Sequence, residues 1–171
     1  GGEFLFLDAD NSILRIASLR PFSLIGGDFA IKDTRRIAFD LLREANSQEK
    51  LSHFQFSLEE ASVWSALSGA PKTTSMGRLF DGVWALLMLE KKNYQPPTYE
   101  GEHAIALEEL AKAWRKSCSS DDLLKSDREV YPCDLNEGVG GFIEIDWRPM
   151  LNRLIFDISN KINYGAIADK F

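Results

Sequence analysis

Residues 75–90 read SMGRLFDGVWALLMLE, and this stretch decides how the rest of the chain has to fold. It predicts a helix in which apolar side chains, beginning at Leu79, fall on nearly every face. A helix that is apolar all round is covered by other elements, so we expect residues 75–90 at the centre of the fold. Asp81 is the polar exception. Because a carboxylate buried without a partner is costly, we expect Asp81 to face a cavity or to have a partner.

Helical spacing recurs on both sides of this central segment. A helix is predicted after a cap at Asp33 or Thr34, and Ser57 with Glu60 has the pattern of a capping box. Asp146 is the expected cap of a later helix that tolerates a proline in its first turn. The further predicted helices cover residues 34–45, 58–67, 102–114, 147–155 and 163–171.

Two β-hairpins are predicted from apolar runs that flank turn residues. Residues 4–7 and 13–16 lie on either side of an Asp/Asn turn, and residues 129–132 and 141–146 flank a second turn at 136–138. Residues 117–127 are polar, and we expect them to be exposed. The fold class is therefore α+β, mostly helical, with two short β-hairpins.

Composition excludes several classes of protein. The chain has 171 residues, with 20 Lys and Arg against 26 Asp and Glu, so its net charge is −6. Its basic residues, such as Arg35 and Arg36, stand beside acidic ones, and we expect them to face solvent. We therefore expect no nucleic-acid partner, because phosphate binding needs a basic surface. No run approaches the roughly 20 apolar residues that cross a bilayer, so we expect no membrane partner.

Cysteine and histidine offer little conventional chemistry. The two cysteines, Cys118 and Cys133, form no CxxC pair, which favours a reducing, cytoplasmic location. His53 and His103 belong to no metal-ligand or nucleophile motif, and we expect both to be surface or half-buried side chains. The sequence by itself assigns no catalytic residue and no metal site.

Three glycine-containing segments are candidate binding sites: residues 26–28 (GGD), 74–78 (TSMGR) and 100–101 (EG). The first is either a place where backbone amides approach an anion or a plain turn capped by Asp28. The second precedes the central helix, so hydroxyls, free amides and the Arg78 guanidinium can meet an anion there. Its alternative is an N-cap with an exposed arginine. The third either closes the same pocket or is a loop with a capping acid.

Six motifs occur in a fixed order along the chain. They are GGEFL at 1–5, RPF at 20–22, GGD at 26–28, SMGRLFD at 75–81, YEGE at 99–102 and DWRP at 146–149. Together they closely resemble the HypF carbamoyltransferases, which mature [NiFe] hydrogenases. The resemblance implies that residues 1–171 are part of a C-terminal TsaD-like carbamoyltransferase domain with an actin/Hsp70-like (ASKHA) fold, truncated at both ends.

The resemblance also implies a reaction and a site. Family members use carbamoyl phosphate and ATP, through a carbamoyl-adenylate, to form a thiocarbamate on the C-terminal cysteine of HypE. By the resemblance, Asp81 holds the nucleotide ribose and Gly101 lines the same nucleotide. The weaker candidate neighbours of the nucleotide are Arg78, Glu100, Gly27 and Asp28. The family's metal ligands fall outside this chain, so we expect the chain alone to lack metal and catalysis.

Two alternative functions are considered, and the sequence differs from the resembled family at three positions of the central helix. The chain is alternatively a non-catalytic helical protein-interaction module, with Trp64 or Trp114 as exposed anchors. Within the enzymes, a TsaD-like tRNA-modifying relative is the other option. Gly82, Trp84 and Met88 are bulkier or different choices at positions where the resembled family often has alanine or glycine, so we expect helix packing to differ there.

Overall fold

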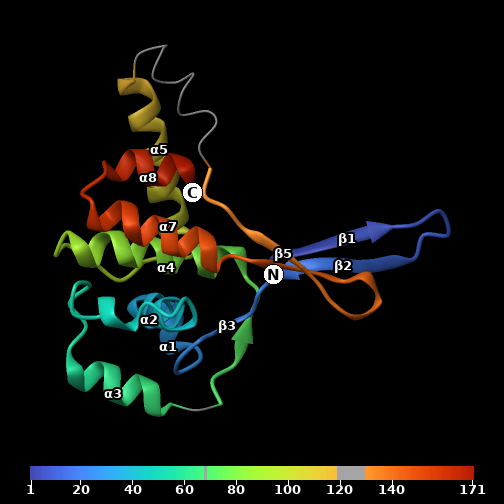
Figure 1. Ribbon diagram of the computed structural model, residues 1–171, viewed down its shortest axis with the longest axis horizontal. Coiled ribbons are helices and arrows are strands. Elements are labelled where there is room, and N and C mark those ends of the chain that lie inside the picture. Colours follow the sequence, from blue (N-terminus) through green and yellow to red (C-terminus); the bar gives the residue numbers. More distant parts are fainter. Residues whose placement is uncertain (68, 119–129) are drawn as a thin grey trace.

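The computed structural model describes residues 1–67, 69–118 and 130–171. Helices gathered around α4 form a body, from which strands β1 and β2 project as a long arm (Figure 1). The helices are α1 Phe29–Lys32, α2 Arg35–Glu44, α3 Leu58–Ala66, α4 Met76–Glu90, α5 Glu102–Ser117, α7 Arg148–Ser159 and α8 Tyr164–Lys170, with short 3-10 helices at Gln48–Lys50 and Val139–Gly141. The strands are β1 Glu3–Leu7, β2 Ile13–Leu19, β3 Phe22–Ser23, β4 Lys72–Thr73, β5 Asp134–Glu137 and β6 Ile143–Asp146. The predicted α+β class is confirmed.

Helix α4 is the centre of the body, as its apolar surface predicts. Its side chains Leu79, Val83, Leu86 and Leu87 are all buried, and helices α2 and α5 pack against it. Its N-terminus is capped by Ser75, whose Oγ accepts a hydrogen bond from the backbone N–H of Arg78 at 3.4 Å. The cap fixes where α4 begins, and with it the positions of the polar residues in its first turns.

Glycine lets helices α2 and α4 approach closely. A Cβ on Gly82 would lie 2.5 Å from Leu41 Cδ1 and 2.9 Å from Ile37 Cγ2, both on α2. Gly165 does the same between α8 and α5, because a Cβ there would lie 2.6 Å from Trp114 Cβ. The glycine at residue 82, where the resembled family often has another residue, therefore has a packing reason: any side chain would push α2 away from the core.

The arm and the C-terminal strands form one four-stranded sheet in the order β1-β2-β6-β5. The first predicted hairpin is confirmed, since β1 and β2 pair antiparallel around a turn at residues 8–12. Strands β5 and β6 also pair antiparallel. The parallel pairing of β2 with β6, which aligns Ala17 with Ile143, merges the two hairpins and was not predicted.

The first strand of the second hairpin is not where the sequence predicted it. Residues 130–132 form no strand, Glu129 lies outside the described residues, and the strand occupies Asp134–Glu137 instead. Tyr131 is drawn into the helical body: its N–H donates to the carbonyl of Lys170 at 3.2 Å and its hydroxyl to Asp157 at 3.0 Å. Burial of this aromatic side chain outweighs its strand preference. Residues 119–127, which we predicted to be exposed, also lie outside the described residues.

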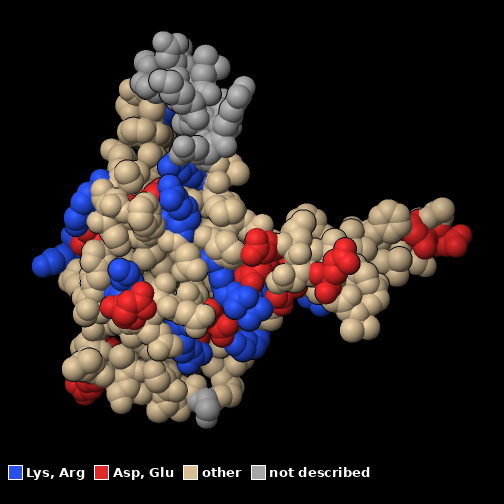
Figure 2. All heavy atoms as spheres, viewed as in Figure 1, with Lys and Arg blue, Asp and Glu red and all other residues tan. Residues whose placement is uncertain are grey.

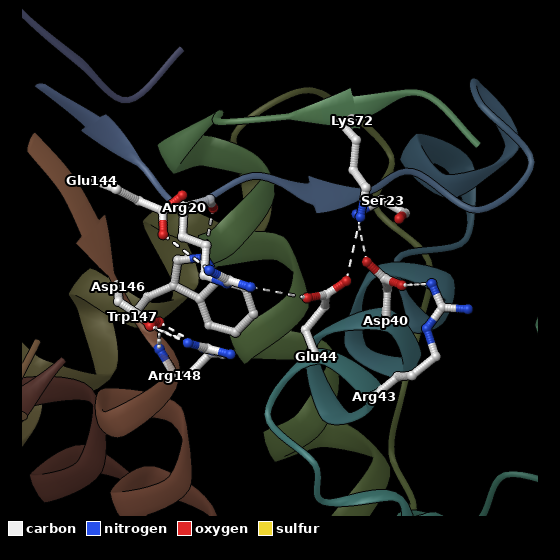
Figure 3. Close-up of polar contacts among 10 residues, drawn as sticks. All are labelled: Arg20, Ser23, Asp40, Arg43, Glu44, Lys72, Glu144, Asp146, Trp147 and Arg148. Carbon is white, nitrogen blue, oxygen red and sulfur yellow. Dashed lines mark hydrogen bonds and ion pairs between the residues drawn. The ribbon is translucent and has the colours of Figure 1, made fainter. Parts of the chain in front are cut away.

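Two of the motifs meet where the arm joins the body (Figure 3). The indole N–H of Trp147 donates to the carbonyl of Arg20 at 2.7 Å, and its ring packs edge-on against Phe22. The Arg20 guanidinium lies 2.9 Å from Glu144 on β6 and 3.9 Å from Glu44 on α2. RPF and DWRP are therefore structural partners that connect the sheet to the helices.

A second set of polar contacts ties α2 to the small β3–β4 sheet (Figure 3). Asp40 is fully buried and accepts a hydrogen bond from the backbone N–H of Ser23 at 2.5 Å and another from Arg43. Lys72 on β4 lies 3.3 Å from Glu44. Burial nevertheless raises the pKa of the Asp40 carboxyl.

Helix α3 closes the other side of the body with an aromatic cluster. Its predicted capping box is confirmed. Trp64 is only 4% exposed and makes edge-to-face contacts with Phe39 and Phe56. Arg35 and Arg36 lie over the same indole, so they are partly buried rather than solvent-facing as predicted. Because Trp64 is buried, it cannot serve as an exposed anchor for a protein partner.

Candidate functional site

A cavity of about 270 Å³ opens where helices α4 and α5 begin. It brings together four of the six predicted site residues, one pair from each helix start: Arg78 and Asp81, Glu100 and Gly101. The complete lining is Ile31, Lys32, Arg78, Asp81, Pro97, Thr98, Tyr99, Glu100 and Gly101. Residues 31 and 32, at the end of α1, belong to a segment that the sequence had not assigned to the site.

Arg78 connects the inside of this pocket with its mouth. Its Nη1 lies 2.8 Å from Asp81 Oδ2, and its Nη2 lies 3.1 Å from Glu100 Oε1. The side chains of Arg78 and Asp81 are 12% and 5% exposed, whereas that of Glu100 is 89% exposed. The guanidinium is therefore largely buried, which rules out the exposed arginine of the N-cap alternative. Glu100 is a surface partner that a ligand can displace at little cost.

Asp81 satisfies both parts of the expectation, since it has a partner and also lines the cavity. Burial raises the pKa of its carboxyl to about 6, the positive charge of Arg78 opposes this, and the negative charge of Glu100 adds to it. A strongly perturbed carboxyl in a cleft is a mark of functional sites. At pH 7 it is mostly ionised, so it can accept hydrogen bonds from the hydroxyl groups of a ligand.

His103 is the residue that sequence reasoning missed. It was predicted to be at the surface or half-buried, and that prediction is wrong: it is 2% exposed. Its Nδ1 lies 3.7 Å from Asp81 Oδ1, and burial lowers the pKa of the imidazole. A signal was present in the sequence, because His103 precedes the buried Leu107 by four residues and so shares the inner face of its helix. His53, by contrast, is exposed as predicted.

Helix α5 begins at a glycine because of its backbone conformation. Gly101 is the N-cap, with φ of 86°, a left-handed conformation that favours glycine. The preceding loop is fixed by Thr98, whose N–H and hydroxyl donate to Glu102 at 2.5 and 2.9 Å. The backbone at Gly101 is thus held at the wall of the pocket with no side chain between it and a ligand.

The remaining two predicted residues do not join this site. Gly27 and Asp28 do not line the cavity. The N–H of Gly27 donates to the carbonyl of Leu24 at 2.8 Å, and the carbonyl of Gly27 accepts from Ala30 at 2.9 Å. The geometry therefore agrees with the plain-turn alternative for residues 26–28, although the Asp28 side chain makes no capping hydrogen bond to α1.

Other hollows and side-chain clusters of the described residues are weaker candidates for a binding site. A hollow of about 350 Å³ between α4, α5 and α8 is lined mainly by apolar groups such as Phe80, Leu107 and Phe171. The charged side chains of Glu108, Lys112, Arg115 and Asp169 also line it, but none of the predicted site residues does. In residues 1–67, 69–118 and 130–171, no group of three or more potential ligands could hold a metal ion.

Basic and acidic side chains are mixed on the surface shown in Figure 2. Figure 2 shows Lys and Arg interspersed with Asp and Glu over the body, and the two signs mix at the base of the arm. Within the part of the chain that the structure describes, no helix is long and apolar enough to span a bilayer.

Comparison with known proteins gives matches over the whole chain. The model of a family described as "Carbamoyltransferase, Kae1-like Domain, second subdomain" matches residues 1–171. The chain is 30% identical over its full length to carbamoyltransferase HypF of Synechocystis sp. PCC 6803, of which it covers 23%. It is 32% identical to the probable carbamoyltransferase HypF of Methanocaldococcus jannaschii, over 74% of this chain and 17% of that protein.

Solved structures agree on the fold. A crystal structure of full-length HypF in the phosphate- and nucleotide-bound form superposes with a TM-score of 0.73 at 24% identity, over 99% of this chain and 24% of that one. HypF from T. kodakarensis gives a TM-score of 0.61 at 18% identity, over 92% of this chain and 20% of that one. The chain thus spans less than a quarter of the length of each of these relatives.

Proposed function

Because the chain belongs to the HypF carbamoyltransferase family, we propose that its pocket holds the nucleotide of a carbamoyl-transfer reaction. In this proposal, the enzyme uses carbamoyl phosphate and ATP to form a carbamoyl-adenylate. The carbamoyl group then passes to the C-terminal cysteine of HypE, on the way to the cyanide ligand of a [NiFe] hydrogenase. The reaction takes place in the cytoplasm, where unpaired thiols such as Cys118 and Cys133 stay reduced.

The observation that carries the proposal is the meeting of Asp81, Arg78 and Gly101 around one cavity. An ionised carboxylate accepts hydrogen bonds from the two hydroxyls of a ribose, and charge-assisted bonds of this kind are strong. The volume of about 270 Å³ lies just below the range of roughly 300–1,000 Å³ that is typical of small-molecule sites. The pocket therefore suits the nucleoside part of ATP rather than the whole molecule.

Each lining group has a distinct task in this proposal. Asp81 accepts the ribose hydroxyls, and Arg78 keeps its carboxylate in place from the opposite side. Gly101 lets the backbone approach the nucleoside, because no Cβ intervenes. Lys32 and the positive N-terminal end of α5 add positive potential near the phosphates. None of these groups breaks or forms a bond, so the chain supplies binding rather than the reacting groups.

The first test is calorimetric titration of the chain with ATP. Asp81→Asn keeps the shape of the side chain but removes its charge, and Asp10→Asn, in the exposed turn of the arm, is the matched control. We expect Asp81→Asn to weaken binding by about tenfold or more, since a hydrogen bond to a charged group contributes roughly 1.5–3 kcal/mol. Equal affinity in both variants and the wild type would contradict the proposal.

The second test separates this function from the two alternatives. In a full-length HypF that carries this chain as its second subdomain, we expect ATP-dependent carbamoyl transfer from carbamoyl phosphate to HypE. The Asp81→Asn variant should transfer more slowly, while Asp10→Asn should not. Modification of tRNA instead of HypE would favour the tRNA-modifying relative. Binding of a protein partner without any nucleotide dependence would favour the interaction module.

A further inference from the structure

His103 is buried next to the pocket and lies beside Asp81 of its lining. On one side its Nδ1 lies 3.7 Å from Asp81 Oδ1 on α4. The backbone of Gln95, in the loop that continues into the pocket lining at residues 97–101, also interacts with the ring and favours its protonated form. The imidazole ring lies 6.0 Å from the ring of Trp84 at a tilt of 34°. One side chain therefore bridges the loop and the helix that bears the carboxylate.

A chain of polar contacts extends from His103 away from the pocket. Its Nδ1 is 3.5 Å from Thr34 Oγ1, which is in turn 3.1 Å from the hydroxyl of Tyr94. That hydroxyl donates to Asp33 at 3.2 Å, and Asp33 is held by Arg35. Buried polar groups with several partners keep a defined orientation, because any rotation leaves a group unsatisfied. The Nδ1 of the imidazole thus lies between Thr34 and Asp81, and both contacts limit rotation of the ring.

We propose that His103 is a positioning residue that holds the Asp81 carboxylate at the pocket wall and sets the pH range in which the pocket binds a nucleoside. This inference rests on the proposed function above, because it concerns the tuning of the same pocket. His103 does not touch the ligand; it acts through Asp81. At 3.7 Å the contact is electrostatic rather than a hydrogen bond, so its influence depends on the polarity that the imidazole adds around the carboxylate.

The charged groups around the pair come from three elements. Arg78 on α4 stabilises the ionised form of Asp81, whereas Glu100 before α5 opposes it. Lys32 at the end of α1 lines the same cavity. Burial and the positive charge of Arg78 lower the pKa of the His103 imidazole, and Glu102 at the start of α5 only partly opposes them. As the pH falls through about 6, Asp81 takes up a proton, and a protonated carboxyl accepts ribose hydroxyls less well.

Two substitutions separate a positioning role from simple filling of space. His103→Leu fills a similar volume without polar groups, and His103→Gln keeps a neutral polar side chain. Since less polar surroundings raise the pKa of a carboxyl, the leucine variant should need a higher pH for binding. We expect its ATP affinity at pH 7.5 to fall about tenfold, and the pH midpoint of binding to move upward. His103→Gln should stay within about twofold of the wild type.

The experiment is calorimetric titration with ATP from pH 5.5 to 8.5, with circular dichroism to confirm folding. His53→Leu and His53→Gln are matched controls at the exposed histidine, and both should behave as the wild type. If His103→Leu binds like the wild type at every pH while Asp81→Asn does not, the inference fails and the proposed function stands. If Asp81→Asn also binds normally, the proposed function fails.

A measurement on the unaltered chain keeps the inference testable if the leucine variant does not fold. Nuclear magnetic resonance of the imidazole nitrogens should show that His103 titrates below the usual pKa of a histidine, because it is buried. Its signals should shift when ATP is added, because the ligand rearranges the charge at Asp81. Imidazole signals of His103 that are insensitive to ATP would overturn the inference.

Discussion

Substitution of Gly82 by alanine tests the central packing of the fold. The added Cβ would lie 2.5 Å from Leu41 Cδ1 and 2.9 Å from Ile37 Cγ2, and both side chains are fully buried. Because Ile37 is β-branched, its χ1 is restricted in a helix, so its Cγ2 moves mainly with the backbone of α2. The substitution therefore pushes two packed helices apart.

Two opposing effects set the size of the change. Overpacking a core costs about 1–3 kcal/mol, whereas replacing glycine by alanine inside a helix gains about 1 kcal/mol. We expect a net loss of up to about 2 kcal/mol in the free energy of unfolding, or several degrees in the melting temperature of a chain of this size. Because Gly82 follows Asp81, the same shift should also disturb the pocket.

The assay is urea-induced unfolding followed by tryptophan fluorescence, with Gly77→Ala as the matched control. Gly77 lies in the first turn of the same helix, and a Cβ there would meet nothing closer than Ser75 Oγ at 3.8 Å. That variant should be as stable as the wild type, or more stable by up to about 1 kcal/mol. If Gly82→Ala matched the stability of Gly77→Ala, the close approach of α2 and α4 would be refuted.

Three further predictions concern capping, titration and the junction of the arm. Ser57→Ala removes the capping box of α3 and should lower the free energy of unfolding by about 1 kcal/mol, whereas Ser52→Ala on the neighbouring turn should not; equal losses in urea unfolding would disprove the capping role. The pKa of Asp81 is raised in the folded state, so the folded chain takes up this proton at a higher pH than the unfolded chain does. Proton binding therefore stabilises the fold as the pH falls through 6. The wild type should therefore gain stability relative to Asp81→Asn between pH 7.5 and 5, and a constant difference would contradict the raised pKa. Trp147→Phe removes the hydrogen bond to the Arg20 carbonyl inside the core and should cost about 1–3 kcal/mol; unchanged thermal unfolding would show that this bond does not hold the arm to the body.

Local signals in the sequence predict most of the helices. The all-round apolar surface of residues 75–90 places α4 at the centre, and Ser57 with Glu60 marks the start of α3, because helix periodicity and capping depend on neighbouring residues. The turn at residues 8–12 specifies the first hairpin in the same way.

Long-range pairings could not be read from such patterns. The parallel contact of Ala17 with Ile143 joins strands from opposite ends of the chain, and no local periodicity records it. Tyr131 leaves its predicted strand because Asp157 and Lys170 offer it partners that only the folded body brings near. Tertiary contacts override local preference in both cases.

In the candidate site too, some residues are marked by the sequence and others depend on tertiary contacts. Asp81 stands out because it is a carboxylate in an apolar helix, and the family resemblance links it to Gly101. The burial of His103 depends on how the loop at residues 94–98 folds over α5, and the contribution of Lys32 depends on a four-residue helix that no motif marked. Lys32 could be recognised only once three separate segments were seen around one cavity, whereas the spacing of His103 from Leu107 already pointed to the inner face of its helix.

The most direct test of the account is a crystal structure of this chain grown with ATP. We predict electron density for the nucleoside in the pocket at the start of α4 and α5, with both ribose hydroxyls within hydrogen-bond distance of the Asp81 carboxylate. Arg78 should keep its contact with Asp81, while Glu100 moves aside. A nucleotide bound elsewhere, with Asp81 still paired only with Arg78, would contradict the assignment of this pocket.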